Sequence, residues 1–339
     1  MVNTPHITFS LGDRSYLAIV KKGIHKLAAQ ANFSAKKIGE IDLVVAEMGS
    51  NLIKHAGGGE ILAGLVKEDQ ETALELISID NGPGIAEPEK IMKDGASSTQ
   101  TLGTGLGSIK RLSDVFELYT KKDWGTIILS RINVKESAKK KQGRNRIHYR
   151  ALVVAKPGET VSGDGTYAIN SGDGMTRLLV ADGLGHGEEA NRAVTRAIQA
   201  FAGFESDSPA EILRHLHADI KKTRGLVGTI VIFDPFKKIW KLCGIGNIST
   251  RLSGYVESRS YIPYNGIVGH NIPNTLNDQE LSQKDYQQII LCSDGIRSRW
   301  ENARHPTIQK YDLVVQAAAI YKEFGRRTDD MSVVIGRIV

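Results

Sequence analysis

Short apolar segments of this chain end abruptly in an aspartate that a glycine follows. The clearest example is the run Leu178-Leu-Val-Ala-Asp182-Gly183-Leu-Gly185-His186-Gly187. A short, continuous apolar run is typical of a buried strand, so Asp182 is delivered to a strand end with little freedom of position. The glycines allow the backbone to turn sharply and to approach a ligand closely. The segment therefore predicts a β-rich core with an acidic turn at its edge.

The same arrangement recurs elsewhere. It is found in Ser162-Gly163-Asp164-Gly165, in Ser293-Asp294-Gly295 after the apolar run 289–292, and in Asp329-Asp330 before the closing run 333–339. A single Asp-Gly is most simply a turn between two elements, but carboxylates collected from several strand ends suit hard cations such as Mg²⁺ or Mn²⁺. Two such cations, roughly 3.5–4 Å apart, activate a water and hold the leaving oxygen of a phosphate. The recurrence therefore predicts a two-metal hydrolytic site.

Residues from about 147 to 339 resemble the SpoIIE-like branch of the metal-dependent, PPM-type serine/threonine protein phosphatases, and within it the RsbX-type enzymes. The resemblance rests on the order of the aspartate motifs and on the pieces Gly228-Thr-Ile-Val-Ile-Phe-Asp234 and Gly244-Ile-Gly-Asn247. It implies an α-β-β-α sandwich with a pair of Mn²⁺ or Mg²⁺ ions at one end. The metal contacts that it implies are Asp164, Asp182, the carbonyl of Gly183, Asp294 and Asp329, with Asp182 and Asp294 as catalytic residues. Asp330 is implied to lie outside the direct metal contacts.

A second constellation lies in the first part of the chain. Glu47 and Asn51 are four residues apart on a predicted helix over about 36–55 and therefore share one face. A predicted strand over 72–80 ends in Asp80-Asn-Gly82-Pro-Gly84, and the run Gly103-Thr-Gly105-Leu-Gly107 is predicted to be a loop that enters a helix. Free N–H groups at such a helix start suit a phosphate. Each piece alone is weak, since the glycine run lacks the Lys-Ser/Thr of a P-loop.

In this order the three pieces resemble the GHKL ATP-binding fold, a Bergerat-type α/β sandwich, over about residues 5–133. The compact size is most similar to the anti-sigma-factor serine kinases of the RsbT and RsbW kind. The resemblance implies ATP with Mg²⁺, and Glu47 as the base that polarises the attacking hydroxyl or water. The implied cofactor contacts are Asn51 for Mg²⁺, Asp80 for the adenine amino group, Gly82 and Gly84 for close approach of the nucleotide, and Gly103, Gly105 and Gly107 for the phosphates.

The chain has 339 residues, enough for two ordinary domains. We expect an α+β fold with two domains: a GHKL-type domain over 1–134, a charged linker over 135–146, and a PPM-type phosphatase domain over 147–339. The linker has no apolar periodicity and is rich in lysine and arginine, which is typical of a solvated tether.

Composition and charge exclude several classes of binding partner and site. The formal charge is +6, but no basic patch is interleaved with aromatic residues, so we do not expect a nucleic-acid partner. No signal peptide and no apolar run of about 20 residues is visible, which favours a cytoplasmic protein without a membrane segment. The two cysteines, Cys243 and Cys292, are expected to be buried thiols in a reducing compartment. His215 and His217 are two apart on a predicted helix, so they do not predict a zinc site.

These observations predict a bifunctional switch protein, in which a metal-dependent phosphatase is joined to an ATP-dependent protein serine kinase. By resemblance, the partner is a small STAS-domain regulatory protein that carries the phosphate on Ser or Thr, and a homodimer is compatible with the kinase half. Two alternatives stay open. The first domain could be a nucleotide-gated binding module, or the phosphatase could be the sole enzyme. Mn²⁺ and Mg²⁺ are not distinguished by carboxylates alone, and the role of His186 is left open.

Overall fold

The computed structural model describes residues 5–68, 71–89, 102–135, 147–171, 174–254, 256–300 and 305–339. The chain divides into two compact units. The N-terminal unit is His6–Lys139 with Ala303–Ala319, and the C-terminal unit is Met1–Pro5, Lys140–Asn302 and Ile320–Val339. Apart from Lys135, the predicted linker 135–146 lies outside the described residues. The predicted domain boundaries therefore stay a prediction.

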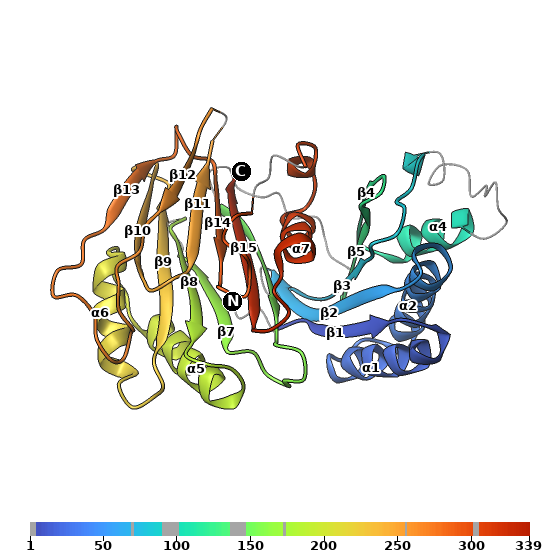
Figure 1. Cartoon of the computed structure of the whole chain (residues 1–339), viewed down its shortest axis with the longest axis horizontal. Coiled ribbons are helices and arrows are strands. Elements are labelled where there is room, and N and C mark those ends of the chain that lie inside the picture. Colours follow the sequence, from blue (N-terminus) through green and yellow to red (C-terminus); the bar gives the residue numbers. More distant parts are fainter. Residues whose placement is uncertain are drawn as a thin grey trace. The chain divides into compact units, whose positions relative to one another are not determined.

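The N-terminal unit is built on one antiparallel sheet with the strand order β1-β2-β3-β5-β4 (Figure 1). Its strands are β1 (Ile7–Leu11), β2 (Gly59–Glu68), β3 (Glu71–Ile79), β4 (Val115–Lys121) and β5 (Gly125–Asn133). Its helices are η1 (Arg14–Tyr16), α1 (Leu17–Gln30), α2 (Ala35–Ala56) and α4 (Leu102–Leu112). Apolar side chains of α1, α2 and α4 pack with those of the strands into one hydrophobic core. The sheet and its helices thus form a two-layer α/β sandwich.

The long helix α2 has clear start and stop signals. The Ser34 hydroxyl accepts a hydrogen bond from the backbone N–H of Lys37 at 3.3 Å, which satisfies one of the free donors at the helix start. The helix ends at Gly57, whose φ of +70° is the left-handed conformation that glycine adopts at helix ends. The buried face consists of Ile41, Val44, Val45, Met48, Gly49 and Leu52. Glu47 and Asn51 flank this face and are half-buried.

Helix α4 differs from the sequence expectation. Gly103, Gly105 and Gly107 were expected in a loop before a helix, but the helix already begins at Leu102 and contains all three. Glycine disfavours a helix interior by about 1 kcal/mol relative to alanine. Leu106 and Ile109 are fully buried in the core against α2, and this packing outweighs the local cost. The prediction of a loop was therefore wrong because tertiary burial overrides propensity here.

The C-terminal unit contains two five-stranded antiparallel sheets (Figure 1). The first, in the order β13-β10-β9-β8-β7, consists of β7 (Asp164–Asn170), β8 (Thr176–Gly183), β9 (Leu226–Asp234), β10 (Ile239–Ile245) and β13 (Gln279–Ser282). The second, in the order β12-β11-β14-β15-β6, consists of β6 (Ile147–Val154), β11 (Ser249–Ser253), β12 (Ser258–Tyr261), β14 (Gln288–Cys292) and β15 (Met331–Ile338). One core lies between the sheets. A second lies between the first sheet and the helices α5 (Glu188–Gly203) and α6 (Pro209–Asp219).

The segment near the C-terminus is shared by the two units. The turn η3 (Ile308–Lys310) and the first residues of α7 (Leu313–Phe324) belong to the N-terminal unit, whereas α7 from Ile320 onward belongs to the C-terminal unit. Both cysteines are buried and free, as expected. No helix among the described residues is long and apolar enough to cross a membrane.

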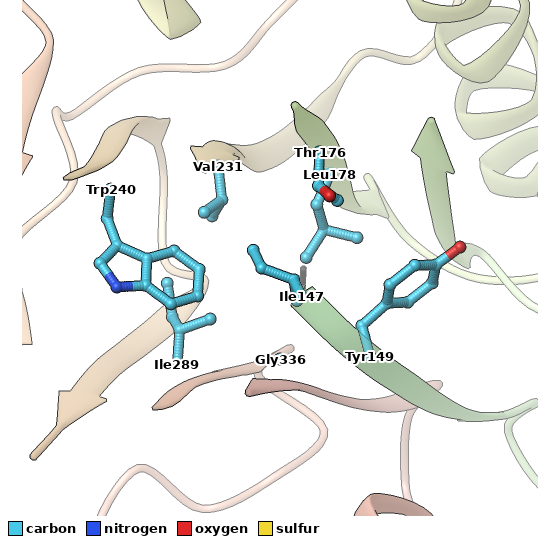
Figure 2. Close-up of a pocket in the computed structure, with 8 residues that line it drawn as sticks. All are labelled: Ile147, Tyr149, Thr176, Leu178, Val231, Trp240, Ile289 and Gly336. Carbon is cyan, nitrogen blue, oxygen red and sulfur yellow. The ribbon is translucent and has the colours of Figure 1, made fainter. Parts of the chain in front are cut away.

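The interior between the two sheets holds a cavity of about 10 Å³ (Figure 2). Its lining is Ile147, Tyr149, Thr176, Leu178, Val231, Trp240, Ile289 and Gly336. This volume is at the lower limit for one water, and the lining offers too few polar partners to hold it. The cavity is a packing gap in the core, so the functional site has to be sought elsewhere.

Candidate functional sites

The C-terminal unit brings the predicted acids to one end of its two sheets. Asp164 opens β7 and pairs directly with Asp182 near the end of β8. On the second sheet, Asp294 follows β14, and Asp329 and Asp330 precede β15, the strand that pairs with β14. Two carboxylates from each sheet end, with Asp330 beside them, are therefore positioned by strand pairing.

Close contacts between glycines and Asp330 show that the acidic turns of the two sheets meet. A Cβ built on Gly295 would lie 1.9 Å from the carbonyl oxygen of Asp330, and one built on Gly163 would lie 2.9 Å from its Oδ2. Only glycine leaves room for the Asp330 backbone beside position 295 and for the Ala190 and Asp330 side chains beside position 163. Gly163 immediately precedes Asp164, and Gly295 immediately follows Asp294. The glycines of the motifs therefore serve to gather the carboxylates.

The gathered charges shift the pKa values of the two opposed aspartates. Burial raises the pKa of Asp182 above its ordinary value, and the charges of Asp164, Asp294, Asp329 and Asp330 raise it further. Burial likewise raises the pKa of Asp164, partly opposed by the hydroxyls of Ser293 and Ser332. Both carboxylate oxygens of Asp164 are buried, and neither makes a hydrogen bond of good geometry with a residue that the structure describes. Opposed, buried acids with raised pKa values are a donor set that fits a divalent cation.

These acids would surround a divalent cation only once it is bound. Within the described ranges, no three His, Cys, Asp or Glu side chains already stand as a ready-made metal-binding group. Carboxylates of like charge repel one another at short distance, and a cation bound among them would offset this repulsion.

The remaining acids have distinct hydrogen-bond partners. Asp330 accepts from the backbone N–H of Lys156 at 2.8 Å and of Gly163 at 2.9 Å, which ties β6 and the turn before β7 to β15. Asp294 accepts from the side-chain amide of Asn247 at 3.0 Å. Asp329 accepts from the N–H of Asp330 at 2.9 Å. Asp330 thus anchors the backbone, while Asp294 is oriented by a side chain.

Sequence reasoning did not find two of these contributors. Asn247 lies in a motif that was noted but not given a role. Glu159 accepts a hydrogen bond from His186 or ion-pairs with it at 2.7 Å between Oε1 and Nδ1, and both side chains are partly exposed. The glycine turn drew attention to His186. Glu159 is 27 residues away in the chain, and no local pattern marks it.

In the N-terminal unit, three of the predicted nucleotide residues, Glu47, Asn51 and Gly105, lie close together where α4 meets α2. A Cβ built on Gly105 would lie 2.5 Å from Oε2 of Glu47 and 3.8 Å from Oδ1 of Asn51. The side-chain nitrogen of Asn51 is buried and has no hydrogen-bond partner among the residues that the structure describes. Helix α4 therefore lies directly against the Glu47–Asn51 face of α2, and only a glycine at position 105 leaves space beside the Glu47 carboxylate.

Asp80 lies in the loop that follows β3. Its Oδ1 accepts from the backbone N–H of Gly82 at 2.8 Å and of Thr126 at 3.1 Å, which fixes the carboxylate against β5. Gly84 has a φ of +77°, and a Cβ there would lie 2.3 Å from the carbonyl oxygen of Lys121. The structure describes Gly103 only as a residue of the first turn of α4. A Cβ on Gly107 would meet only the flexible end of Arg111, at 3.1 Å.

Comparison with known proteins identifies the N-terminal part. Residues 12–131 match the histidine kinase-like ATPase domain. Over 102 residues the chain is 34% identical to the serine/threonine-protein kinase RsbT of Bacillus subtilis, a match that covers 30% of this chain and 77% of RsbT. The chain belongs to the histidine kinase-like ATPase family, in company with RsbT. The GHKL fold predicted from the Glu47, Asp80 and glycine motifs is thereby confirmed.

The remainder of this ATPase-family chain has phosphatase relatives. Over 194 residues it is 22% identical to the phosphoserine phosphatase RsbX of Bacillus subtilis, covering 56% of this chain and 96% of RsbX. A chain from a structural study of the bacterial stressosome superposes with a TM-score of 0.52 at 25% identity, covering 57% of this chain and all (100%) of that one. A crystal structure of RsbX with magnesium superposes with a TM-score of 0.51 at 19% identity, covering 58% and 98%. The predicted PPM-type fold is confirmed.

Proposed function

We propose that this chain is a bifunctional switch protein that removes phosphate from a phosphoserine or phosphothreonine of a regulatory protein and transfers phosphate from ATP. The C-terminal unit is the phosphatase, and the N-terminal unit is an ATP-dependent serine kinase. The observation that carries the phosphatase half is the opposition of Asp164 and Asp182 on paired strands, with Asp294 and Asp329 at the adjoining sheet end.

The residues that would hold two Mn²⁺ or Mg²⁺ ions are Asp164, Asp182, the carbonyl of Gly183, Asp294 and Asp329. When bound, such ions activate water and stabilise the oxygens of a transferring phosphoryl group. Other residues of the protein hold these acids in place. Asn247 orients Asp294 through its amide. Asp330 accepts one backbone hydrogen bond from Gly163, just before Asp164, and one from Lys156, just after β6. Strand β8 holds the Asp182 side chain at the end of the sheet, opposite Asp164.

The phosphatase assignment is tested by replacing one acid from each sheet. Asp182→Ala and Asp294→Ala should each lower manganese-dependent hydrolysis of a phosphoserine protein on the order of a thousand-fold, because each removes a cation contact. Asp285→Ala changes an exposed aspartate of the same unit and serves as the control. Wild-type turnover in both site variants would overturn the assignment.

The kinase half rests on the relationship of Glu47 to Asn51 and Gly105. A carboxylate one helical turn from an Asn that would hold Mg²⁺ can reach the nucleophile at the γ-phosphate. Asp80, fixed by two backbone N–H groups, would receive the adenine amino group, and Gly82, Gly84, Gly103, Gly105 and Gly107 would allow the nucleotide to approach the backbone. A binding module that only sequesters a partner has no need of a base at position 47.

Labelled ATP distinguishes the two possibilities for this unit. Glu47→Ala should lower transfer of label to a protein substrate by about 10²–10⁴-fold while ATP still binds. Label transfer that persists in Glu47→Ala would contradict the role of Glu47. Binding of ATP without transfer by the wild type, under every condition tried, would establish the gated binding module instead.

We further propose a small STAS-domain regulatory protein as the partner, since RsbT and RsbX both match this one chain. The experiment is capture of the partner from native cells with and without ATP, followed by mapping of its phosphorylated residue. A homodimer through the kinase half is part of the same proposal and is tested by sedimentation.

A further inference from the structure

A single arginine lies against the turn that carries Asp182. Strands β8 and β9 pair with Gly183 opposite Leu226, and the N–H of Leu184 donates to the carbonyl of Gly225 at 3.1 Å. The residue before Gly225 is Arg224. Strand pairing thus carries Arg224 to the end of the sheet where Asp182 lies.

The guanidinium is held close to the backbone of that turn. A Cβ built on Gly185 would lie 3.1 Å from Nη1 of Arg224, and the φ of Gly185 is +86°. Two features therefore favour glycine at position 185: the left-handed backbone conformation and the nearby Arg224 side chain. Any larger residue would push the guanidinium away from the turn.

The Arg224 side chain lies beside the Gly185 turn with no side-chain partner among the described residues. Its guanidinium forms no hydrogen bond or ion pair with any residue that the structure describes. Its backbone carbonyl lies 2.8 Å from Nε2 of His270. The side chain is exposed, as are the neighbouring Lys221 and Lys222. His186, on the other side of Gly185, is already paired with Glu159. The one guanidinium at the turn is therefore available to an incoming anion.

We propose that Arg224 is a specificity-determining residue that binds the phosphoryl group of a phosphomonoester substrate beside the turn that carries Asp182 and Gly183. The planar fork of arginine matches two phosphate oxygens at once. The guanidinium lies against Gly185, two residues after Gly183, so it stands beside the same turn as the proposed cation contacts Asp182 and Gly183. This inference rests on the phosphatase function proposed above.

The test uses the full chain loaded with Mn²⁺, in the variants Arg224→Ala and Arg224→Lys, with Lys222→Ala as a control that removes one nearby positive charge. Three quantities are measured: kcat/KM for a phosphoserine peptide, the inhibition constant of inorganic phosphate, and the Kd for Mn²⁺ by calorimetry. Arg224→Ala should lower kcat/KM and weaken phosphate inhibition by roughly 10- to 100-fold, the effect of losing charge-assisted hydrogen bonds. Arg224→Lys should recover part of both, and Mn²⁺ affinity should stay at the wild-type value.

Two outcomes separate this inference from the proposed function. Wild-type kcat/KM and phosphate inhibition in Arg224→Ala, in an enzyme that Asp182→Ala inactivates, would overturn the role of Arg224 and leave the phosphatase standing. Equal losses of kcat/KM and of phosphate inhibition in Arg224→Ala and Lys222→Ala would mean that only the general positive charge of the surface matters. That result would also overturn the role of Arg224. If the wild type hydrolyses nothing, direct calorimetry of inorganic phosphate on the Mn²⁺-loaded chain still tests the arginine, since only its loss of binding in Arg224→Ala supports the site.

Discussion

At the scale of single residues, Asp164 and Asp182 occupy directly opposed positions on β7 and β8. Like charges at such positions destabilise a sheet, and here burial adds to the effect because it penalises the ionised form. The folded chain responds by holding protons on these carboxyls above the pH at which an unfolded chain releases them. The residues that make the site thus weaken the metal-free fold, and a cation relieves that cost.

This linkage predicts how stability changes with pH. The pKa values of Asp164 and Asp182 are raised above the ordinary 3.8, so the folded state binds more protons than the unfolded state above that pH. In EDTA-treated protein, the contribution of these groups to the free energy of unfolding should fall as the pH rises from about 5 to about 8. Urea unfolding at several pH values measures it, and Mn²⁺ should restore the lost stability with release of protons.

Other groups act in the opposite direction, so a variant is needed as the reference. Burial lowers the pKa of His55 and of His217, which adds stability as the pH rises through the ordinary histidine range near 6.5. Asp182→Asn keeps these histidines and removes one of the opposed charges. Its stability should fall less with pH than that of the wild type. A steeper fall in the variant would show that the aspartates do not carry the linkage.

At the scale of elements, the packing of α4 on α2 controls the position of Glu47. Gly105→Ala places a Cβ where the Glu47 carboxylate now lies, 2.5 Å from Oε2. We expect the displaced carboxylate to slow ATP turnover at least 10-fold, since a general base has to lie within hydrogen-bond reach of its proton. The measurement is release of labelled phosphate from ATP.

A second glycine in the same layer provides the matched control. Gly39 lies in α2, and a Cβ there would have no atom within 4 Å. Gly39→Ala should raise helix stability by about 0.5–1 kcal/mol and leave ATP turnover unchanged. Equal effects of the two substitutions on turnover would mean that contact with Glu47 is irrelevant and that only helix propensity had changed.

At the scale of the whole molecule, the segment Ala303–Ala319 completes the N-terminal unit. Arg131 on β5 donates to Glu75 at 2.9 Å through Nε and to Asp312 at 3.2 Å through Nη1, and all three side chains are largely buried. Asp312 also accepts from the N–H of Val314 at 2.9 Å at the start of α7. A residue 181 positions from Arg131 thus balances a charge inside the sheet layer.

Asp312→Ala removes both interactions and should lower the free energy of unfolding by about 2–4 kcal/mol, because Arg131 keeps only Glu75 and the helix loses its cap. Urea unfolding followed by circular dichroism measures the loss. Asp219→Ala breaks an Asp–Arg pair with Arg196 that is exposed to solvent and should cost no more than about 1 kcal/mol. A loss in Asp312→Ala as small as in this control would show that the segment does not stabilise the unit.

Local patterns in the sequence were sufficient for the elements and for the kinds of residue at their ends. Helix α2 with its Ser34 cap, the acid-ended strands and the Glu47–Asn51 spacing all follow from periodicity and turn chemistry, which act over a few residues. The glycine run at 103–107 shows where local patterns fail. It is helical because Leu106 and Ile109 are buried against α2, an element that lies far from the glycines in the sequence.

Sequence patterns were enough to predict two α+β domains and aspartates at the ends of their strands. They could not predict which of these aspartates face each other, that Arg224 lies against the turn at Gly185, or that Asp312 pairs with Arg131. The physical reason is that strand register and side-chain packing join residues far apart in the chain. Their energies depend on the whole arrangement of sheets and helices, whereas turns and helix ends depend on their immediate neighbours.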